Sequence, residues 1–451
     1  MRTIFLESEP IARASLLSLN SVRRSSGTFP WRMRFQVDDL FVSASFRPPE
    51  AIASKFDSAG VSLLAGSILC DLAAEVRPNR VVIKPPCLTY DFGEVFADAV
   101  YSLMTEEDAY WRRSRFLSAP VIQGSFTKRK PSKEALDRNK VVLGFSGGKD
   151  SIVSLFALLA AGYNVVPVLL NEGDGTWQEL KKWIPRLMKL ELPTLVAFLS
   201  TGRRIDLRDF YGNWYFSSYQ IGWLVATLAL CASALNAGTV CLGIEASADL
   251  GWHMYRGRQI NHQHQKTGGH LKLLERFYRR TLNPQIRIGS PIATLTDTEV
   301  IQVLLTKVPQ VFQEFSTCGA SNSRTKNCGK CSKCAFVYAL LCASSSGQAL
   351  ANRIFQTVPL EDEELYRPWL DSRLRSPLGC IGRKIEVWSA FEALIRAGSK
   401  ASVVHRWKKS NLRRRVLSTG AGRGDLTSAI QSPLTIPVAR ASRLVEAWSR
   451  T

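Results

Sequence analysis

A glycine-rich segment between a predicted strand and a predicted helix constrains this 451-residue chain more than any other feature. Val141 to Phe145 is an apolar, β-branched run typical of a buried strand, and a helical pattern runs from Ile152 to Ala161. Between them lies Ser146-Gly147-Gly148-Lys149-Asp150-Ser151. Unpaired N–H groups and the positive end of the helix dipole would meet there, so the segment predicts an anion site suited to phosphate.

The residue types of this loop fit that chemistry. The two glycines allow positive φ and a close backbone approach to phosphate oxygens, and the two serines add hydroxyl donors. Asp150 would help to hold the Mg²⁺ that accompanies phosphates. Lys149 either reaches phosphate or faces solvent on the helix. The alternative is a helix cap without a ligand, because Ser and Asp commonly occur at helix starts.

The chain around the loop alternates short apolar runs with helical patterns. Predicted strands at 165–170, 195–199 and 239–244 alternate with predicted helices at 177–190 and 221–235, which is typical of parallel βαβ units. We therefore predict an α/β fold with a central parallel sheet. Its expected parts are an N-terminal α+β domain (1–136), the central domain (137–345), a helical C-terminal part (346–398) and a basic, mobile tail (399–451).

Charge and hydropathy limit the partners and the location. Lys and Arg number 59 against 38 Asp and Glu, a net charge of +21 that suggests nucleic acid or a highly phosphorylated small molecule. About +9 of this charge lies in residues 400–451, which weakens the case for nucleic acid. The chain shows neither a secretory signal nor a 20-residue apolar span, so we expect a cytoplasmic protein.

A cysteine cluster predicts a structural metal site. Two residues separate Cys328 from Cys331 and Cys331 from Cys334, and Cys318 lies ten positions before Cys328. Four thiolates suit tetrahedral Zn²⁺ with no open position, so the ion would pin a loop rather than activate water. An iron–sulfur cluster is the alternative.

Four of the five histidines fall between His253 and His270, after the predicted strand that leads into Glu245. Side chains that titrate near neutral pH would be needed for proton transfer at carbon. A polar loop whose histidines only cap or bridge backbone groups is the alternative.

The loop resembles the signature Ser-Gly-Gly-x-Asp-Ser of the PP-loop ATP pyrophosphatases. That resemblance implies a five-stranded parallel sheet, ATP bound at the carboxyl ends of its strands, and cleavage of ATP to AMP and pyrophosphate with adenylation of the substrate. Residues 137–345 would form this PP-loop domain. The loop lacks the Lys-Ser/Thr ending of a Walker loop, so γ-phosphate transfer is not implied.

Two groups of PP-loop enzymes share further motifs with the chain. The cysteine pattern resembles 7-cyano-7-deazaguanine synthase, which turns a carboxylate into an amide and then a nitrile. A broader resemblance is to the MurL-type UDP-N-acetylmuramoyl-L-alanyl-L-glutamate epimerases. It rests on the following segments, in this order: Gly147 to Ser151, Glu245 with Ser247 and Ala248, Asn261 to Gln263, Cys328 to Val337, and Cys380-Ile381-Gly382 with Glu386.

The epimerase resemblance implies a substrate and a mechanism. ATP would adenylate the glutamyl carboxylate of a UDP-linked peptide in peptidoglycan precursor synthesis, and the α-proton would then be removed and returned on the other face. The proton carrier would be His262, with Glu245, His253 and Lys266 as further candidates. The other functions considered are the synthase reaction, a PP-loop tRNA-modifying enzyme and a non-catalytic adenine-nucleotide sensor.

Overall fold

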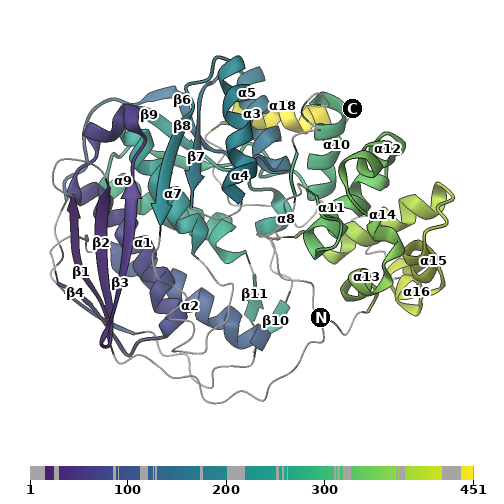
Figure 1. The fold of residues 1–451 in the computed structure, drawn as a ribbon, viewed down its shortest axis with the longest axis horizontal. Coiled ribbons are helices and arrows are strands. Elements are labelled where there is room, and N and C mark those ends of the chain that lie inside the picture. The colour runs from purple at the N-terminus through teal and green to yellow at the C-terminus, as the bar shows by residue number, and fades with distance from the viewer. Residues whose placement is uncertain are drawn as a thin grey trace.

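The computed structural model describes most of the chain. The described residues are 16–24, 30–84, 88–89, 91–111, 120–124, 126, 129–172, 176–200, 219–249, 253–255, 258–261, 263–308, 311, 315–317, 327–371, 374, 381–418 and 438–449. They form one ten-stranded mixed sheet in the order β12-β9-β6-β7-β8-β3-β2-β1-β4-β5, with helices packed against it (Figure 1).

Five parallel strands make up the part of the sheet that holds the glycine-rich loop. They are β6 (Asp137–Gly144), β7 (Asn164–Asn171), β8 (Leu195–Ser200), β9 (Ala237–Cys241) and β12 (Arg287–Gly289). Val142 of β6 belongs to the core on one face of the sheet, while Val141 and Leu143 belong to the core on the other. A parallel strand buried on both faces explains the continuous apolar run in the sequence. The predicted α/β class is confirmed.

Helices cover both faces of these strands. On one face α3 (Lys149–Ala160) packs with α10 (Asp297–Lys307) and α18 (Ala439–Ser449). On the other, α7 (Gln220–Ala234) packs with α1 (Ser58–Val76), which contacts α2 (Phe92–Trp111), and α2 contacts α9 (Gly268–Thr281). The helix expected over 177–190 is split into α4 (Thr176–Leu180), the 3₁₀ turn η2 (Lys181–Trp183) and α5 (Ile184–Lys189), which has a proline in its first turn.

The N-terminal strands extend the same sheet. They are β1 (Leu16–Arg24), β2 (Trp31–Val37), β3 (Leu40–Arg47), β4 (Arg80–Ile83) and β5 (Val121–Gly124). Strand β3 pairs antiparallel with β8 and so joins them to the five parallel strands. The 3₁₀ helix η1 (Glu50–Lys55) follows β3. The α+β composition is as predicted, but the strands do not form a sheet of their own. The prediction that residues 1–136 form a domain of their own stays a prediction.

The C-terminal part is helical, as expected. Within residues 346–398 lie most of α12 (Ser345–Ile354), η5 (Pro359–Glu361), α13 (Glu363–Leu370) and α14 (Lys384–Arg396), while α11 (Ser332–Cys342) precedes them at the end of the predicted central domain. None of the helices in the described part of the chain combines the length and the apolar composition that a membrane span requires.

The tail that we expected to be mobile contains further packed helices, α15 (Ser402–Lys409) and α16 (Asn411–Ser418), besides α18. Trp407 is fully buried and donates from Nε1 to Glu392 at 2.8 Å. The Arg413 guanidinium forms two hydrogen bonds to the same carboxylate, at 2.7 and 3.0 Å. The basic composition of the tail therefore did not reveal its short amphipathic helices, whose apolar sides are buried.

Candidate active site

The glycine-rich loop lies at the switch point of the sheet. Strands β7 and β8 extend from β6 in one direction, while β9 and β12 extend in the other. The loops after β6 and β9 therefore diverge at the carboxyl ends of these strands, which is where open parallel sheets bind ligands. A cleft with a volume of about 430 Å³ opens at this point, and residues 144–151 and 242–245 line it.

The loop has the backbone shape that its sequence predicts. Gly147 has φ +70°, and a Cβ there would come within 2.6 Å of Trp183 Nε1. Ser151 Oγ donates to the Gly148 carbonyl at 3.0 Å and accepts from the Ser146 backbone N–H at 3.3 Å. Helix α3 begins at Lys149, so its first turn faces the cleft.

Lys149 is buried among carboxylates, which rules out the solvent-facing orientation. Its Nζ contacts Asp150 at 2.5 Å and also pairs with Asp297, the first residue of α10. Glu245, which follows β9 and is 6% exposed, lies close enough for its negative charge to raise the pKa of Lys149. The structure therefore brings three of the predicted residues, Lys149, Asp150 and Glu245, together with Asp297, which the sequence analysis missed.

Burial and mutual repulsion change the protonation of these groups. Burial raises the pKa of Glu245 to about 7, and the nearby Asp297 and Asp150 add to this. Burial likewise raises the pKa of Asp297 to about 7, although Lys149 opposes the rise. Burial would lower the pKa of Lys149, but the three surrounding carboxylates raise it well above its ordinary value. The cleft thus holds a fixed cation and two acids that can exchange protons near neutral pH.

The segment around Gly382 and Glu386 packs against the same carboxylates. Glu386 is fully buried, accepts from the backbone N–H of Arg383 at 2.9 Å and of Thr298 at 3.3 Å, and has its pKa raised by burial. A Cβ on Gly382 would come within 2.3 Å of Asp297 Oδ2. Glycine is required here because the chain passes directly over the aspartate. Cys380 lies outside the described residues.

The histidine-rich segment reaches the cleft through Lys266. This lysine lines the cleft from the 3₁₀ turn η3 (His264–Lys266), and its Nζ donates to Gln263 at 2.7 Å. Asn261 Nδ2 donates to the Ala248 carbonyl at 2.8 Å, which ties the segment to the short helix α8 (Ala246–Asp249) after Glu245. His262, the favoured proton carrier, lies outside the described residues. His253 lies in β10 (His253–Tyr255), which pairs with β11 (Arg258–Ile260).

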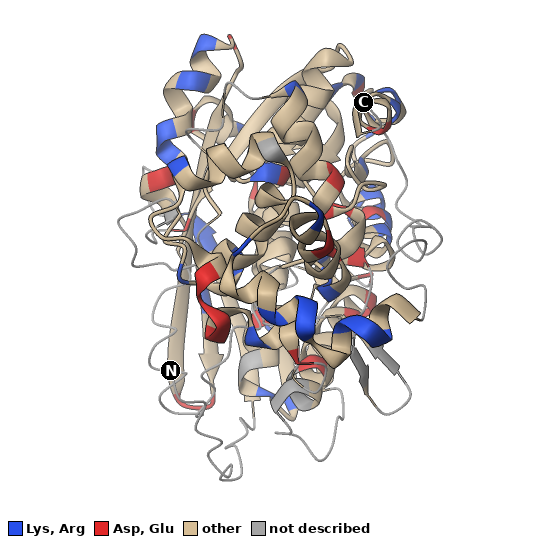
Figure 2. Ribbon diagram, turned by 90° about the vertical axis from the view of Figure 1, so that its right-hand side faces the viewer, with Lys and Arg blue, Asp and Glu red and all other residues tan. Residues whose placement is uncertain are grey.

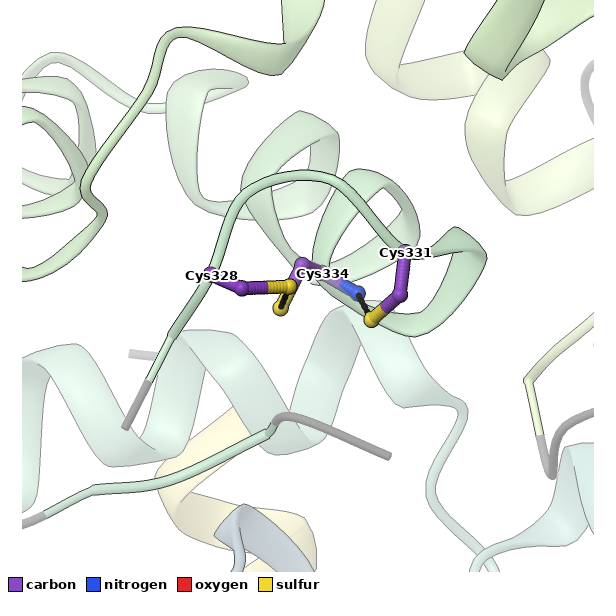
Figure 3. Close-up of side chains that lie close together, drawn as sticks. All are labelled: Cys328, Cys331 and Cys334. Atoms are coloured by element: carbon purple, nitrogen blue, oxygen red, sulfur yellow. Dashed lines mark hydrogen bonds between the residues drawn. The ribbon is translucent and has the colours of Figure 1, made fainter. Parts of the chain in front are cut away.

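The cysteine cluster forms next to one wall of the cleft. Cys328, Cys331 and Cys334 come from the turn before α11 and its first residues, and their sulfurs lie within 4.8 Å of one another (Figure 3). The Sγ atoms of Cys328 and Cys334 are 3.8 Å apart. Two thiolates bound tetrahedrally at about 2.3 Å from Zn²⁺ would be about 3.8 Å apart, so this spacing fits the ion.

Cys318, the fourth predicted ligand, lies outside the described residues. The preceding residue, Thr317, has its Oγ1 3.5 Å from Cys334 Sγ, so the chain reaches the cluster just before Cys318. Residues 315–317 and Lys333 also line the cleft. A metal ion held here would fix that wall.

These features define an α/β protein with a glycine-rich loop at the switch point of its sheet and a buried lysine–carboxylate cluster in the adjoining cleft. Comparison with known proteins narrows this class. Residues 313–417 match the family model described as the MurL C-terminal domain, so the resemblance to the MurL-type family is confirmed over that region.

A second comparison concerns a shorter stretch. Over 54 residues, the chain is 41% identical to 7-cyano-7-deazaguanine synthase 1 of Desulfitobacterium hafniense (strain Y51). The match covers 12% of this chain and 24% of that synthase, so the chain spans about a quarter of the length of this curated relative.

Proposed function

We propose that the chain is an ATP-dependent epimerase that adenylates the glutamyl carboxylate of a UDP-linked peptide and inverts the adjacent α-carbon. One observation carries this proposal: the region that resembles the MurL C-terminal domain supplies a wall of the cleft into which the glycine-rich loop opens. That region also contains Glu386, which packs next to Asp297. The epimerase-like part and the anion loop therefore serve one site.

The first step would be attack of the substrate carboxylate on the α-phosphorus of ATP, which forms an acyl-adenylate and releases pyrophosphate. Ser146, Gly147, Gly148 and Ser151 would bind the pyrophosphate, and Lys149 would turn from its carboxylate partners toward phosphate. Asp150 is the residue that would hold Mg²⁺, because its side chain is partly exposed at the mouth of the loop. The bound ion would offset negative charge on the phosphates.

The second step would be proton transfer at the α-carbon. An ionised carboxylate makes the neighbouring C–H far too weakly acidic, and adenylation removes that charge. A base can then take the proton, and the enolate accepts a proton on its opposite face. Hydrolysis of the adenylate would release AMP and the epimerised product.

The carboxylates of the cleft are suited to this work. Glu245 and Asp297 both have pKa values raised to about 7, so either can hold or release a proton near neutral pH. Asp297 is thus an addition to the predicted set of His262, Glu245, His253 and Lys266. Lys266 could stabilise the enolate, because it brings a positive charge into the same cleft.

A synthase-like reaction is the second candidate, favoured by the 54-residue match. It would use the same adenylation but would add ammonia to the acyl group instead of moving the α-proton. The tRNA-modifying alternative is less well supported, because Lys and Arg are spread over several elements with acidic residues between them (Figure 2). A cytoplasmic location stays a prediction.

The proposal is tested by incubating the protein in D₂O with ATP, Mg²⁺ and UDP-N-acetylmuramoyl-L-alanyl-L-glutamate. We expect gain of one deuteron at the glutamyl α-carbon and formation of AMP, both dependent on ATP, as measured by mass spectrometry. Asp150→Ala should lower AMP formation by about 10²–10³-fold, since the side chain that would hold the charge-neutralising Mg²⁺ is lost. Asp39→Ala, in an exposed turn, is the matched control.

The outcomes separate the candidates. AMP formation without deuterium exchange would refute epimerisation and favour another acyl substrate. Absence of both would refute the proposed reaction for this peptide. Normal turnover by Asp150→Ala would refute the role given to the loop.

A further inference from the structure

A second group of metal-ligating side chains lies outside the catalytic cleft. Asp98 comes from α2, His264 from η3 and His270 from α9. One ligand atom from each lies within 4.8 Å of the other two. Asp98 lies 166 residues before His264 and 172 before His270 in the sequence, so the tertiary fold brings the carboxylate to the two histidines.

The imidazoles converge on a single carboxylate oxygen. His270 Nδ1 lies 2.6 Å and His264 Nε2 lies 2.9 Å from Asp98 Oδ2, and the two rings are 5.4 Å apart between centroids. His270 is fully buried, whereas the side chains of His264 and Asp98 are 29% and 37% exposed. The cluster is therefore closed on one side and accessible from solvent on the other.

The surroundings provide an outer shell of the kind found around metal-binding histidines. Tyr219 Oη lies 2.6 Å from His270 Nε2, and the backbone N–H of Tyr219 donates to Asp71 at 2.8 Å. A hydrogen bond to the second ring nitrogen fixes the orientation and tautomer of a histidine ligand. With Nδ1 binding an ion, Nε2–H would donate to the tyrosine oxygen.

A small cavity adjoins the cluster. It has a volume of about 10 Å³ and is lined by Glu106, Tyr219 and His264, among others. Such a space is close to that of one water molecule. Glu106 is 2% exposed, so a buried carboxylate also borders the cavity beside His264.

We propose that Asp98, His264 and His270 bind a divalent transition-metal ion, with Zn²⁺ as the probe ion. Two imidazoles and one carboxylate give a nitrogen and oxygen donor set that suits such an ion. This donor set has no sulfur and so differs from that of the cysteine cluster. The ion would tie α2 to the turn that carries Lys266 into the cleft.

The test is metal analysis of the full chain after saturation with Zn²⁺ and removal of loosely bound ion. His264→Gln should hold one equivalent of zinc less than His405→Gln. The control is matched because His405 is exposed on α15, away from the cluster. Equal zinc content in the two variants would overturn the proposal and leave a hydrogen-bonded triad without an ion. Asp98→Asn, which keeps the side-chain shape, should also lose one equivalent.

Cobalt substitution gives an independent readout. The Co²⁺ spectrum of His405→Gln minus that of His264→Gln should contain ligand-field bands without a sulfur charge-transfer band. A difference spectrum dominated by sulfur charge transfer would overturn the assignment. Both measurements are made without ATP or substrate, so their result is separate from that of the proposed epimerase reaction.

Discussion

Replacement of Glu245 by glutamine should remove the pH dependence that this buried carboxyl group imposes on the free energy of unfolding. The side chain is 6% exposed and lies near two other carboxylates, which, together with burial, raise its pKa to about 7. In the unfolded chain, the same group would have its ordinary pKa of about 4.5. Glu245→Gln keeps the shape and removes the titration.

The direction and size of the effect follow from proton uptake on folding. Below pH 4.5 the glutamate is protonated in both states, so it carries no charge into the fold. Between pH 4.5 and 7 the unfolded chain releases the proton and the folded protein retains it, so the free energy of unfolding falls as pH rises. The two pKa values correspond to a loss of about 3 kcal/mol, complete just above pH 7.

Urea denaturation of the wild type and Glu245→Gln at pH 4.5, 6 and 8 would measure this effect. The variant should gain about 3 kcal/mol on the wild type between the lowest and highest pH, while losing proton exchange at the α-carbon. Glu364→Gln, with its side chain 75% exposed, is the control and should show no such trend. A stability difference between Glu245→Gln and wild type that stays constant with pH would refute the account of a buried, repelled carboxylate.

Two further predictions concern the loop and the metal cluster. Gly147→Ala should lower the free energy of unfolding by about 1–2 kcal/mol, because alanine is strained at positive φ. It should also weaken binding of an ATP analogue in calorimetry, because the new Cβ would collide with Trp183 beside the loop. Gly162→Ala, also at positive φ but in open space, should cost stability alone, so equal nucleotide affinity in the two variants would contradict this reasoning. Cys331→Ser should lose bound zinc and lower the urea midpoint relative to Ser332→Ala, and unchanged zinc content would refute the cysteine site.

The central fold was predictable because its signals are local. Val141, Val142 and Leu143 are all apolar because β6 is buried on both faces, and the loop that follows must contain glycine where φ is positive. The joining of β3 to β8 was not predictable. The alternation in β2 and β3 specifies which side chains face the core, but it does not specify the strand beyond their edge.

The tail shows a second limit of composition. Eleven basic residues in 52 suggest a solvated segment, yet Val403, Val404 and Trp407 form one apolar side of an eight-residue helix. Helices this short are stabilised by packing rather than by their own propensity. Their existence therefore depends on partners such as Glu392 of α14, which a local pattern cannot reveal.

Asp297 was missed for a different reason. Thr296-Asp297-Thr298-Glu299 is the capping box of α10, with Thr296 accepting from Glu299 N–H and the Glu299 side chain accepting from Thr296 N–H. The positive end of the helix dipole is reason enough for an acidic residue at the first helical position, so the sequence holds no further signal for chemistry. The signal appears in three dimensions: the helix start is buried beside Lys149 and beneath Gly382, and Asp297 Oδ2 has no hydrogen-bond partner among the described residues. The first residue of an ordinary capped helix thereby becomes an acid whose pKa is raised to about 7.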